Sequence, residues 1–575
     1  MKKIRLIAAF VALIFLASCE KEPKVVELSI SETSVTLARS GSDARAYVKI
    51  TSNLSWEAES DASWIKTVPA SGEAGKTYSM IIAADSNDEP VSRTASIKVT
   101  AGSVVKTIEV NQMPGVRRLT PSDVPNYEKI YIPLEFRGDG FLSSDGRWFF
   151  GRSAQSEHFI LFWEAGYGEN GDRSPSLCAD PRFKVNIDNL LKWAEKCYDK
   201  YINVMDFTEK GKSQLEKYKF EIFLHYQEEW AAYGSGQDNV VGCLWLNPDA
   251  ARDNSTIAHE IGHSFQYQTY CDRIYNKIVP DDLSTSFRYV RPEMGTGFWE
   301  QTAQWQSMVM CPEEIFTNWY FDFYGYPAET SDASDLGCFV RNTHRHVLHE
   351  ITRYSNYFIH FYWVDKYGID FISKIWKKSI APQDALETSM SVNGMSVADL
   401  NQDLYSYAAR CATWDFSICS TEGLKHIGDI TWSGTAVEDG YIKVSRDRAP
   451  EATGFNVITL EGFKAGDVVT MDLTGLPEDK DYGIVTDPSA GGWTIGFVAL
   501  DRNYSRKYSP SVTAGKSTDG KAQLTWEIPE GTSKLWAVVS ATPEKYFTHY
   551  WDENNSNDRL WPYKIRFDGA SPVIN

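Results

Sequence analysis

One stretch constrains the fold of this 575-residue chain more than any other, namely TIAHEIGHSFQYQ at residues 256 to 268, which carries two histidines four residues apart. Asp253, Asn254 or Ser255 can cap a helix that begins there. Apolar residues at every fourth position of the stretch would give that helix a buried stripe. The sequence therefore predicts an amphipathic helix that presents both histidines on one face.

His259 and His263 would lie about one turn apart on this helix, at the spacing that lets two imidazoles bind one zinc ion. Glu260 is rotated by about 100° from His259, so it can reach a water on the open side of such a metal. The alternative is an ordinary helix whose histidines make hydrogen bonds in the core. Gly262, a poor helix former, favours the metal site because it permits close packing there. We therefore expect Zn²⁺ as the cofactor.

A catalytic zinc needs a third protein ligand and one open position. No third histidine follows shortly after His263, so a glutamate on a later helix is the expected solution. Glu300 heads the predicted helix GFWEQTAQWQSMVM, and its aromatic neighbours indicate a buried carboxylate that needs a partner. Glu293 competes, but it lies among proline and glycine residues in a predicted loop. We therefore predict that His259, His263 and Glu300 are the metal ligands.

The HEIGH spelling of the motif, together with the Glu-x-x-Ala pattern of Glu300 and Ala303, resembles gluzincin-type zinc metallopeptidases. The resemblance covers residues 131 to 425 in outline, and its specific residues are few. It implies an α+β zincin-like domain that hydrolyses peptide bonds, with Glu260 as the general base. The strand VVGCLWLNP, directly before the helix, would be the edge strand that holds an extended substrate.

Gluzincins often add a tyrosine or histidine that stabilises the oxyanion, and the stretch HRHVLHEITRYSNY offers several candidates. We choose Tyr354 as this second catalytic residue. The alternative is that these aromatic residues pack the helical part of the domain. The candidates are His344, His346, His349, Tyr354 and Tyr357.

The N-terminus reads as a targeting signal. Residues 1 to 19 combine a basic start, a short apolar stretch and small residues before a cysteine, which is the layout of a secretion signal. Leu16-Ala17-Ser18-Cys19 resembles the bacterial lipobox, which implies cleavage before Cys19 and lipidation of its thiol. We expect a lipid-anchored protein of the outer membrane or cell surface. The net charge of −19 argues against a nucleic-acid partner.

Residues 26 to 114 contain short alternating strands with turn residues between them, which predicts an immunoglobulin-like β-sandwich. The segment resembles the BACON domain, and that family implies carbohydrate binding. Because no exposed aromatic platform can be identified here, we favour a spacer whose tryptophans belong to the core. The residues that carry the resemblance are Trp56, Trp64, Asn87, Arg93 and Gln112.

The rest of the chain divides by its periodicity. Residues 115 to 130 are rich in proline and turn residues and make a linker. Residues 131 to 425 mix strands and helices, and residues 347 to 378 are expected to form two helices broken at Gly368. Residues 428 to 575 return to a period of two, which predicts a C-terminal jelly-roll-like β-sandwich. The predicted fold class is therefore a multidomain chain with an α+β centre between two β-sandwiches.

These features predict a lipid-anchored zinc metallopeptidase outside the cytoplasm, whose substrate is a protein or glycoprotein. Glycan binding by the β-sandwiches is a possible addition. The main alternative is a non-catalytic glycan-binding lipoprotein whose zinc helix is degenerate or structural. A glycoside hydrolase with an unrelated carboxylate pair is a third alternative, because such enzymes need only two suitably separated carboxylates.

Overall fold

The structure is a computed structural model, which describes residues 25–168, 173–279, 297–318, 321, 338–380, 382–419, 421–483, 487–551 and 558–574. The signal segment with Cys19 and the alternative ligand Glu293 lie outside the described residues. The chain divides into two compact units, Met1–Arg118 and Leu119–Asn575. Within the described part, no helix is long and apolar enough to cross a membrane.

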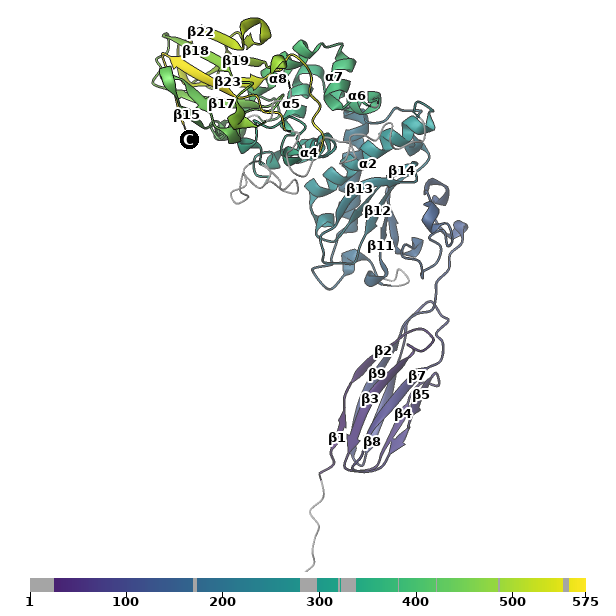
Figure 1. Ribbon diagram of the computed structural model, residues 1–575. Coiled ribbons are helices and arrows are strands. Elements are labelled where there is room, and N and C mark those ends of the chain that lie inside the picture. Colours follow the sequence, from purple (N-terminus) through teal and green to yellow (C-terminus); the bar gives the residue numbers. More distant parts are fainter. Residues whose placement is uncertain are drawn as a thin grey trace, which may run out of the picture. The chain divides into compact units, whose positions relative to one another are not determined.

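The first unit is a β-sandwich, as the alternating pattern predicts (Figure 1). One sheet has the strand order β1-β3-β7-β5 and the other β2-β9-β8-β4-β6. All neighbours are antiparallel except β2 and β9, which are parallel. The strands are β1 (Leu28–Ile30), β2 (Ser34–Leu37), β3 (Arg45–Ser52), β4 (Trp56–Ser60), β5 (Ile65–Val68), β6 (Ser71–Gly72), β7 (Thr77–Ala84), β8 (Arg93–Ala101) and β9 (Val104–Gln112).

The residues that carry the BACON resemblance stabilise this sandwich from inside. The buried amide of Gln112 donates to the carbonyls of Ala38, Arg39 and Asp85, and its oxygen accepts from Arg93 Nε at 2.8 Å. The Arg93 guanidinium lies 4.3 Å from the centre of the Trp64 ring. Trp56 is 1% exposed. Both tryptophans therefore serve the core, as expected, and neither offers an open platform to a sugar.

The second unit begins with a five-stranded mixed sheet of order β10-β11-β12-β14-β13 (Figure 1). The inner strands β11, β12 and β14 are parallel, and the two edge strands are antiparallel to them. Strands β11 and β12 are buried along their whole length because helices cover one face and the segment 119–150 covers the other. The strands are β10 (Ser153–Gln155), β11 (Phe159–Trp163), β12 (Phe220–Leu224), β13 (Ala232–Gln237) and β14 (Val241–Leu246), and α1 (Ile187–Asp199) connects β11 to β12.

The expected edge strand is wrong. VVGCLWLNP forms β14, but β14 lies between β12 and β13, and β13 is the edge. Strand β13 escapes prediction because its two glycines weaken the strand signal. Asp238 and Asn239 adopt left-handed backbone angles, with φ of 51° and 57°, and fold β13 back onto β14 as a tight hairpin.

Helices cover the sheet and extend from it. The predicted motif helix is α2 (Asn254–Tyr275), and the predicted glutamate helix is α4 (Phe298–Met310), which ends before Pro312 as expected. The predicted break at Gly368 is confirmed, since α5 and α6 meet there. The remaining helices are α5 (Phe358–Tyr367), α6 (Phe371–Lys378), α7 (Ala385–Asn393) and α8 (Val397–Cys411).

The prediction that a helix begins at residue 347 is wrong, because α5 begins only at Phe358. Residues 347–357 form turns around a short 3₁₀ segment, Glu350–Thr352. Here a side chain accepts a hydrogen bond from a backbone amide that would otherwise bond within a helix, since the amide of Ile351 donates to His349 Nδ1 at 3.1 Å. The result is an irregular buried loop in place of a helix.

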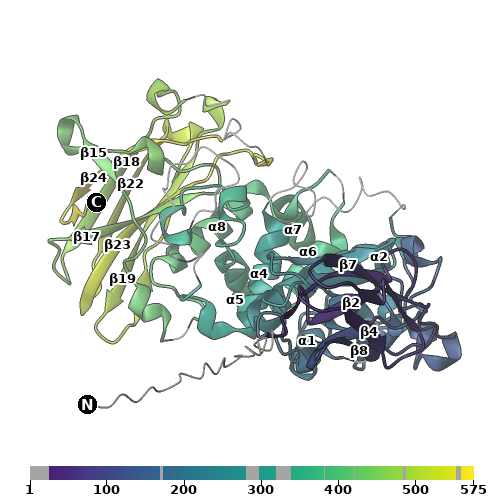
Figure 2. The same cartoon turned by 90° about the horizontal axis from the view of Figure 1, so that it is seen from below.

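The C-terminal β region consists of two sheets, ordered β15-β16-β24-β18-β22 and β20-β19-β23-β17-β25, with β21 paired to β19. Their inner faces share one apolar core. The outer face of the β17/β19/β23 sheet packs on α8, which Figure 2 shows between these strands and the other helices. The strands are β15 (Gly434–Ala436), β16 (Ile442–Val444), β17 (Phe455–Glu461), β18 (Val468–Gly475), β19 (Trp493–Asp501), β20 (Arg506–Tyr508), β21 (Val512–Ala514), β22 (Lys521–Glu527), β23 (Thr532–Ala541), β24 (Tyr563–Asp568) and β25 (Ser571–Pro572).

Alternation along β23 explains why this region belongs to the same compact unit as the mixed sheet. Ala537 and Val539 face the sandwich core, whereas Trp536 and Val538 belong to the helical core. Both faces of the strand are therefore buried, and the sandwich continues the helical part without a linker.

We predict that Gln112→Ala destabilises the first unit by at least about 2 kcal/mol, because it removes a buried amide that bonds the carbonyls of Ala38, Arg39 and Asp85 and the Nε of Arg93. Urea denaturation of residues 25–118 measures this. Thr107→Ala, at an exposed position of the same strand, is the control and should change the stability by less than about 0.5 kcal/mol. Equal stability of the two variants would contradict the role given to Gln112.

Candidate metal centre

The motif helix α2 is fixed at its start and is packed closely along its length. The Asp253 side chain accepts hydrogen bonds from the amides of Ser255 and Thr256, which caps the helix as predicted. A Cβ atom at Gly262 would lie only 3.2 Å from Ala303 Cα. Glycine at this position therefore lets α2 and α4 approach closely, which brings residues of both helices to one point.

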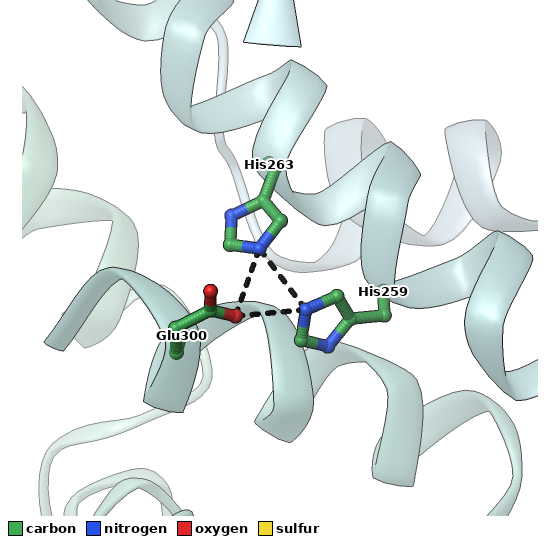
Figure 3. A group of neighbouring side chains, drawn as sticks. All are labelled: His259, His263 and Glu300. Carbon is green, nitrogen blue, oxygen red and sulfur yellow. Dashed lines mark hydrogen bonds and ion pairs between the residues drawn. The ribbon is translucent and has the colours of Figure 1, made fainter. Parts of the chain in front are cut away.

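His259, His263 and Glu300 meet at that point (Figure 3). The two Nε2 atoms of the histidines are 3.0 Å apart. Glu300 Oε2 lies 3.0 Å from His259 Nε2 and 3.1 Å from His263 Nε2. The three atoms form a nearly equilateral triangle, and all three residues are at most 8% exposed. The structure thus brings together the three ligands predicted from the sequence.

Neighbouring amides orient both imidazoles. His259 Nδ1 lies 3.0 Å from Gln304 Oε1, and His263 Nδ1 lies 3.1 Å from Gln266 Oε1. The Gln266 side chain donates a hydrogen bond from Nε2 to the Trp299 carbonyl, and this bond turns the Gln266 Oε1 toward His263. Each Nδ1 therefore carries a hydrogen and donates it, so that each Nε2 directs a lone pair toward the other histidine and Glu300.

Tyr354 completes the arrangement around the carboxylate. Its hydroxyl donates to Glu300 Oε1 at 2.7 Å, which leaves Oε2 directed at the two histidines. The structure places Tyr354 beside the predicted ligands, with its ring stacked 5.8 Å from that of His259. In this arrangement the hydroxyl positions a predicted ligand, and the predicted role in oxyanion stabilisation stays a prediction.

This donor set fits a divalent metal ion. Three lone pairs that converge in a buried place repel one another unless a cation lies between them. Ligands of a tetrahedral zinc with bonds of 2.0–2.1 Å lie about 3.3 Å from one another, close to the observed triangle. Two imidazoles and one carboxylate also leave a fourth position open. The three residues could therefore hold zinc with one position free for water or substrate.

The electrostatics of the site follow from its burial and its opposite charges. Burial would raise the pKa of Glu300, but the charge of His263 and hydrogen bonds with both histidines hold it well below its usual range. Burial lowers the pKa of His263, yet the charge and hydrogen bond of Glu300 raise it to about 9. Without a metal, a proton would thus take the central position.

Glu260 faces a cleft of about 650 Å³ beside the triangle. The cleft is lined mainly by polar residues, which include Asp253, Glu314 and Tyr354, and no lysine or arginine is among its described lining residues. Burial raises the pKa of Glu260, although the charges of His259 and His263 oppose this. A carboxylate with a raised pKa at the edge of an open cleft is well suited to accept a proton near neutral pH.

The edge strand β13 packs directly on this glutamate. A Cβ atom at Gly234 would lie 2.1 Å from the backbone oxygen of Glu260. Ala232, on the same face of β13, lines the cleft together with Trp230. The strand that the sequence analysis missed is thus the one that borders the site.

The other histidines considered in the sequence analysis lie elsewhere. His344, His346 and His349 are buried, and the rings of His346 and His349 stack on that of His549. Two further groups come close enough together to hold an ion, first His349 with Glu350 and His549, and second His349 with Glu451 and Asp558.

A metal does not suit these two groups. The Glu451 and Asp558 carboxylates already bind the guanidinium of Arg345, at 2.8 and 2.7 Å. His349 uses the lone pair of its Nδ1 for a backbone amide, so its Nε2 carries the proton.

Sequence reasoning missed Gln266 and Gln304, which orient the imidazoles. Their spacing could have revealed them, because Gln266 follows His263 by three residues and Gln304 follows Glu300 by four. Residues three or four apart lie on one face of a helix. Polar residues at these offsets from one predicted ligand are candidates to orient that ligand or another ligand of the same site.

Comparison with known proteins agrees with the division of the chain. The chain combines a BACON-like β-sandwich with a second unit, which joins an α+β region to a β region. The second unit contains the group of His259, His263 and Glu300. Residues 122–573 match DUF6055, a family of unknown function, and the chain belongs to this family. Residues 54–113 match the BACON family, described as a candidate N-terminal binding domain, which confirms that prediction. No curated protein matches the chain.

Similarity to solved structures is low. Domains 4 and 5 of the S-layer protein SbsC are 16% identical over 15% of this chain and 52% of that one, with a TM-score of 0.13. The family 22 carbohydrate-binding module of Clostridium thermocellum Xyn10B is 14% identical over 25% and 82% of the two chains, with a TM-score of 0.16. A Bacteroides ovatus GH5 xyloglucanase is 14% identical over 50% and 62%, with a TM-score of 0.15. The chain spans only about half of the S-layer match, and none of these scores carries an argument about fold or function.

We predict that zinc binds the metal-free protein more weakly as the pH falls. Because the pKa of His263 is raised to about 9, zinc must displace its proton at lower pH. The apparent affinity should therefore fall by about tenfold per pH unit below about pH 8.5. Competition with a chromophoric chelator measures it, and an affinity that is constant between about pH 6.5 and about pH 8.5 would contradict the prediction.

Proposed function

We propose that this protein is a zinc-dependent metallopeptidase. The proposal is carried by one observation, the buried triangle of His259 Nε2, His263 Nε2 and Glu300 Oε2 beside a cleft into which Glu260 faces. Two imidazoles, one carboxylate and an open fourth position are the features of a catalytic rather than a structural zinc site.

When bound, zinc would supply Lewis acidity, which lowers the pKa of a water ligand and polarises a scissile carbonyl. The residues of the chain have separate tasks. Glu260 accepts a proton from the attacking water and delivers it to the leaving amine, for which its raised pKa is suitable. Gln266 and Gln304 keep the imidazoles in the required tautomer, and Tyr354 holds the carboxylate of Glu300.

The edge strand β13 supports a peptide as the substrate. Among the described strands it pairs only with β14, so its other edge can add an extended peptide by backbone hydrogen bonds. The strand contacts Glu260 through Gly234, which would bring such a peptide next to the general base. The indole of Trp230, 60% exposed, lies at the same cleft.

The context proposed for this activity is extracytoplasmic. The lipobox-like sequence at Cys19 supports a lipid anchor in the outer membrane, and the BACON domain would serve as a spacer after it. A protein or glycoprotein at the cell surface is then the proposed substrate class.

We expect Glu260→Gln to keep its zinc and to lose at least about a hundredfold in peptidase activity, because the substitution removes the proton acceptor without touching a ligand. A library of peptides and glycopeptides, read by mass spectrometry, measures cleavage. Glu313→Gln is the control, because its exposed carboxylate does not line the cleft. Equal activity of wild type and Glu260→Gln would contradict the proposal. A wild type that binds zinc and glycans but cleaves nothing would favour the non-catalytic alternative.

A further inference from the structure

A buried contact joins the C-terminal β region to the loop that carries Tyr354. We call residues 344–354 the brace loop and residues 543–551 the strap. His549 Nε2 of the strap lies 2.6 Å from Glu350 Oε2 of the brace loop, and both residues are at most 5% exposed. This hydrogen bond and the charge of Glu350 raise the pKa of His549 although burial lowers it, which favours the charged form of the contact.

Further bonds tie the brace loop to the C-terminal region. The carboxylate of Glu451 accepts from the amide of His346 at 2.7 Å and from Arg345 at 2.8 Å. The amide of Val347 donates to Thr453 Oγ1 at 2.9 Å, and the amide of Glu451 donates to the carbonyl of His344 at 2.8 Å. The first four residues of the loop are therefore held by a segment about a hundred positions later in the sequence.

From its other side, the brace loop holds the start of α4. The carbonyl of Leu348 accepts from the amide of Gly297, the residue before α4, at 2.9 Å. The carbonyl of Val347 accepts from the side chain of Gln301 at 2.7 Å. Glu300 lies between these two attachments, and Tyr354 at the end of the loop donates to its carboxylate. The loop thus fixes both the backbone and the side chain of the third predicted ligand.

A second connection runs through stacked side chains. The Arg353 guanidinium lies 5.0 Å from the ring centre of Trp551 in the strap and 5.3 Å from that of Tyr354. The Tyr354 ring in turn stacks 5.8 Å from the ring of His259. The strap is therefore connected to two of the three predicted ligands, His259 through this stack and Glu300 through the loop.

Stability alone is a weak reason to bury such a network. Replacing buried ion pairs by apolar residues is often neutral or stabilising, whereas a polar network fixes one geometry among several. Here the fixed geometry is that of a centre whose three ligand atoms must stay about 3 Å from one another.

We infer that the C-terminal β region is a structural part of the metal centre, and that Glu350, His549 and Trp551 are positioning residues for it. The strap holds the brace loop, the loop holds Glu300 and Tyr354, and the metal affinity depends on this chain of contacts. The inference rests on the proposed metal centre. It assigns the C-terminal β region a task in metal binding, which differs from the glycan binding considered for the β-sandwiches.

The test compares residues 20–575 of the wild type with Glu350→Gln and Trp551→Ala. Glu350→Gln removes the charge that pairs with His549, and Trp551→Ala removes a half-buried side chain at little risk to folding. Asp472→Asn is the matched control, because Asp472 on β18 pairs with Arg566 on β24, outside the brace loop and the strap. Thermal unfolding checks that each variant is folded.

Three measurements follow on the same samples. Both variants should bind Co²⁺ at least about tenfold more weakly than the wild type and change its visible absorption spectrum, because supporting contacts of metal ligands have effects of that size. The amides of residues 297–301 should also exchange hydrogen faster. The control should match the wild type in all three.

Wild-type affinity, spectrum and exchange in both folded variants would overturn the inference. A wild type that binds no metal would defeat the proposed function instead. Hydrogen exchange in the metal-free protein would then still decide whether the strap and the brace loop position Glu300: faster exchange at residues 297–301 in the variants supports this positioning, and unchanged exchange contradicts it.

Discussion

Three lone pairs directed at one buried point are the constraint on which this structure depends. At separations of 3.0–3.1 Å, His259, His263 and Glu300 need a positive charge between them, which a proton can supply without a metal and which we propose a zinc ion supplies in the working protein. Neighbouring side chains fix the orientation of these three residues. Gln266 and Gln304 set the imidazole tautomers, and a tyrosine takes up the remaining carboxylate oxygen.

Close backbone approaches bring the constraint about. Gly262 permits the contact of α2 with α4, and Gly234 permits the contact of β13 with α2. The C-terminal sheets contribute through α8 and through the brace loop, so that strands far along the chain stabilise a centre formed much earlier in it. This arrangement gives a physical reason for one family to span residues 122–573 without a break.

The parts of the site that could be predicted from the sequence are those set by local periodicity. The four-residue spacing of His259 and His263 fixes their common face, and the aromatic residues around Glu300 indicate its burial. The edge strand β13 could not be predicted, because Gly234 is a weak strand former. Its lack of a side chain permits the close contact with α2, which the sequence alone does not show. The irregular loop before α5 also escaped prediction, since the bonds that replace its helix, to Glu451 and Thr453, come from about a hundred residues away.

The metal content of purified residues 20–575, measured by mass spectrometry beside His259→Ala and Glu300→Ala, tests the central claim most directly. We predict about one zinc ion per wild-type chain and its loss in either variant, because a three-ligand site does not keep its affinity with two ligands. A wild type without zinc, or a zinc content that neither substitution changes, would contradict the account and leave His259 and His263 as residues of an ordinary packed helix.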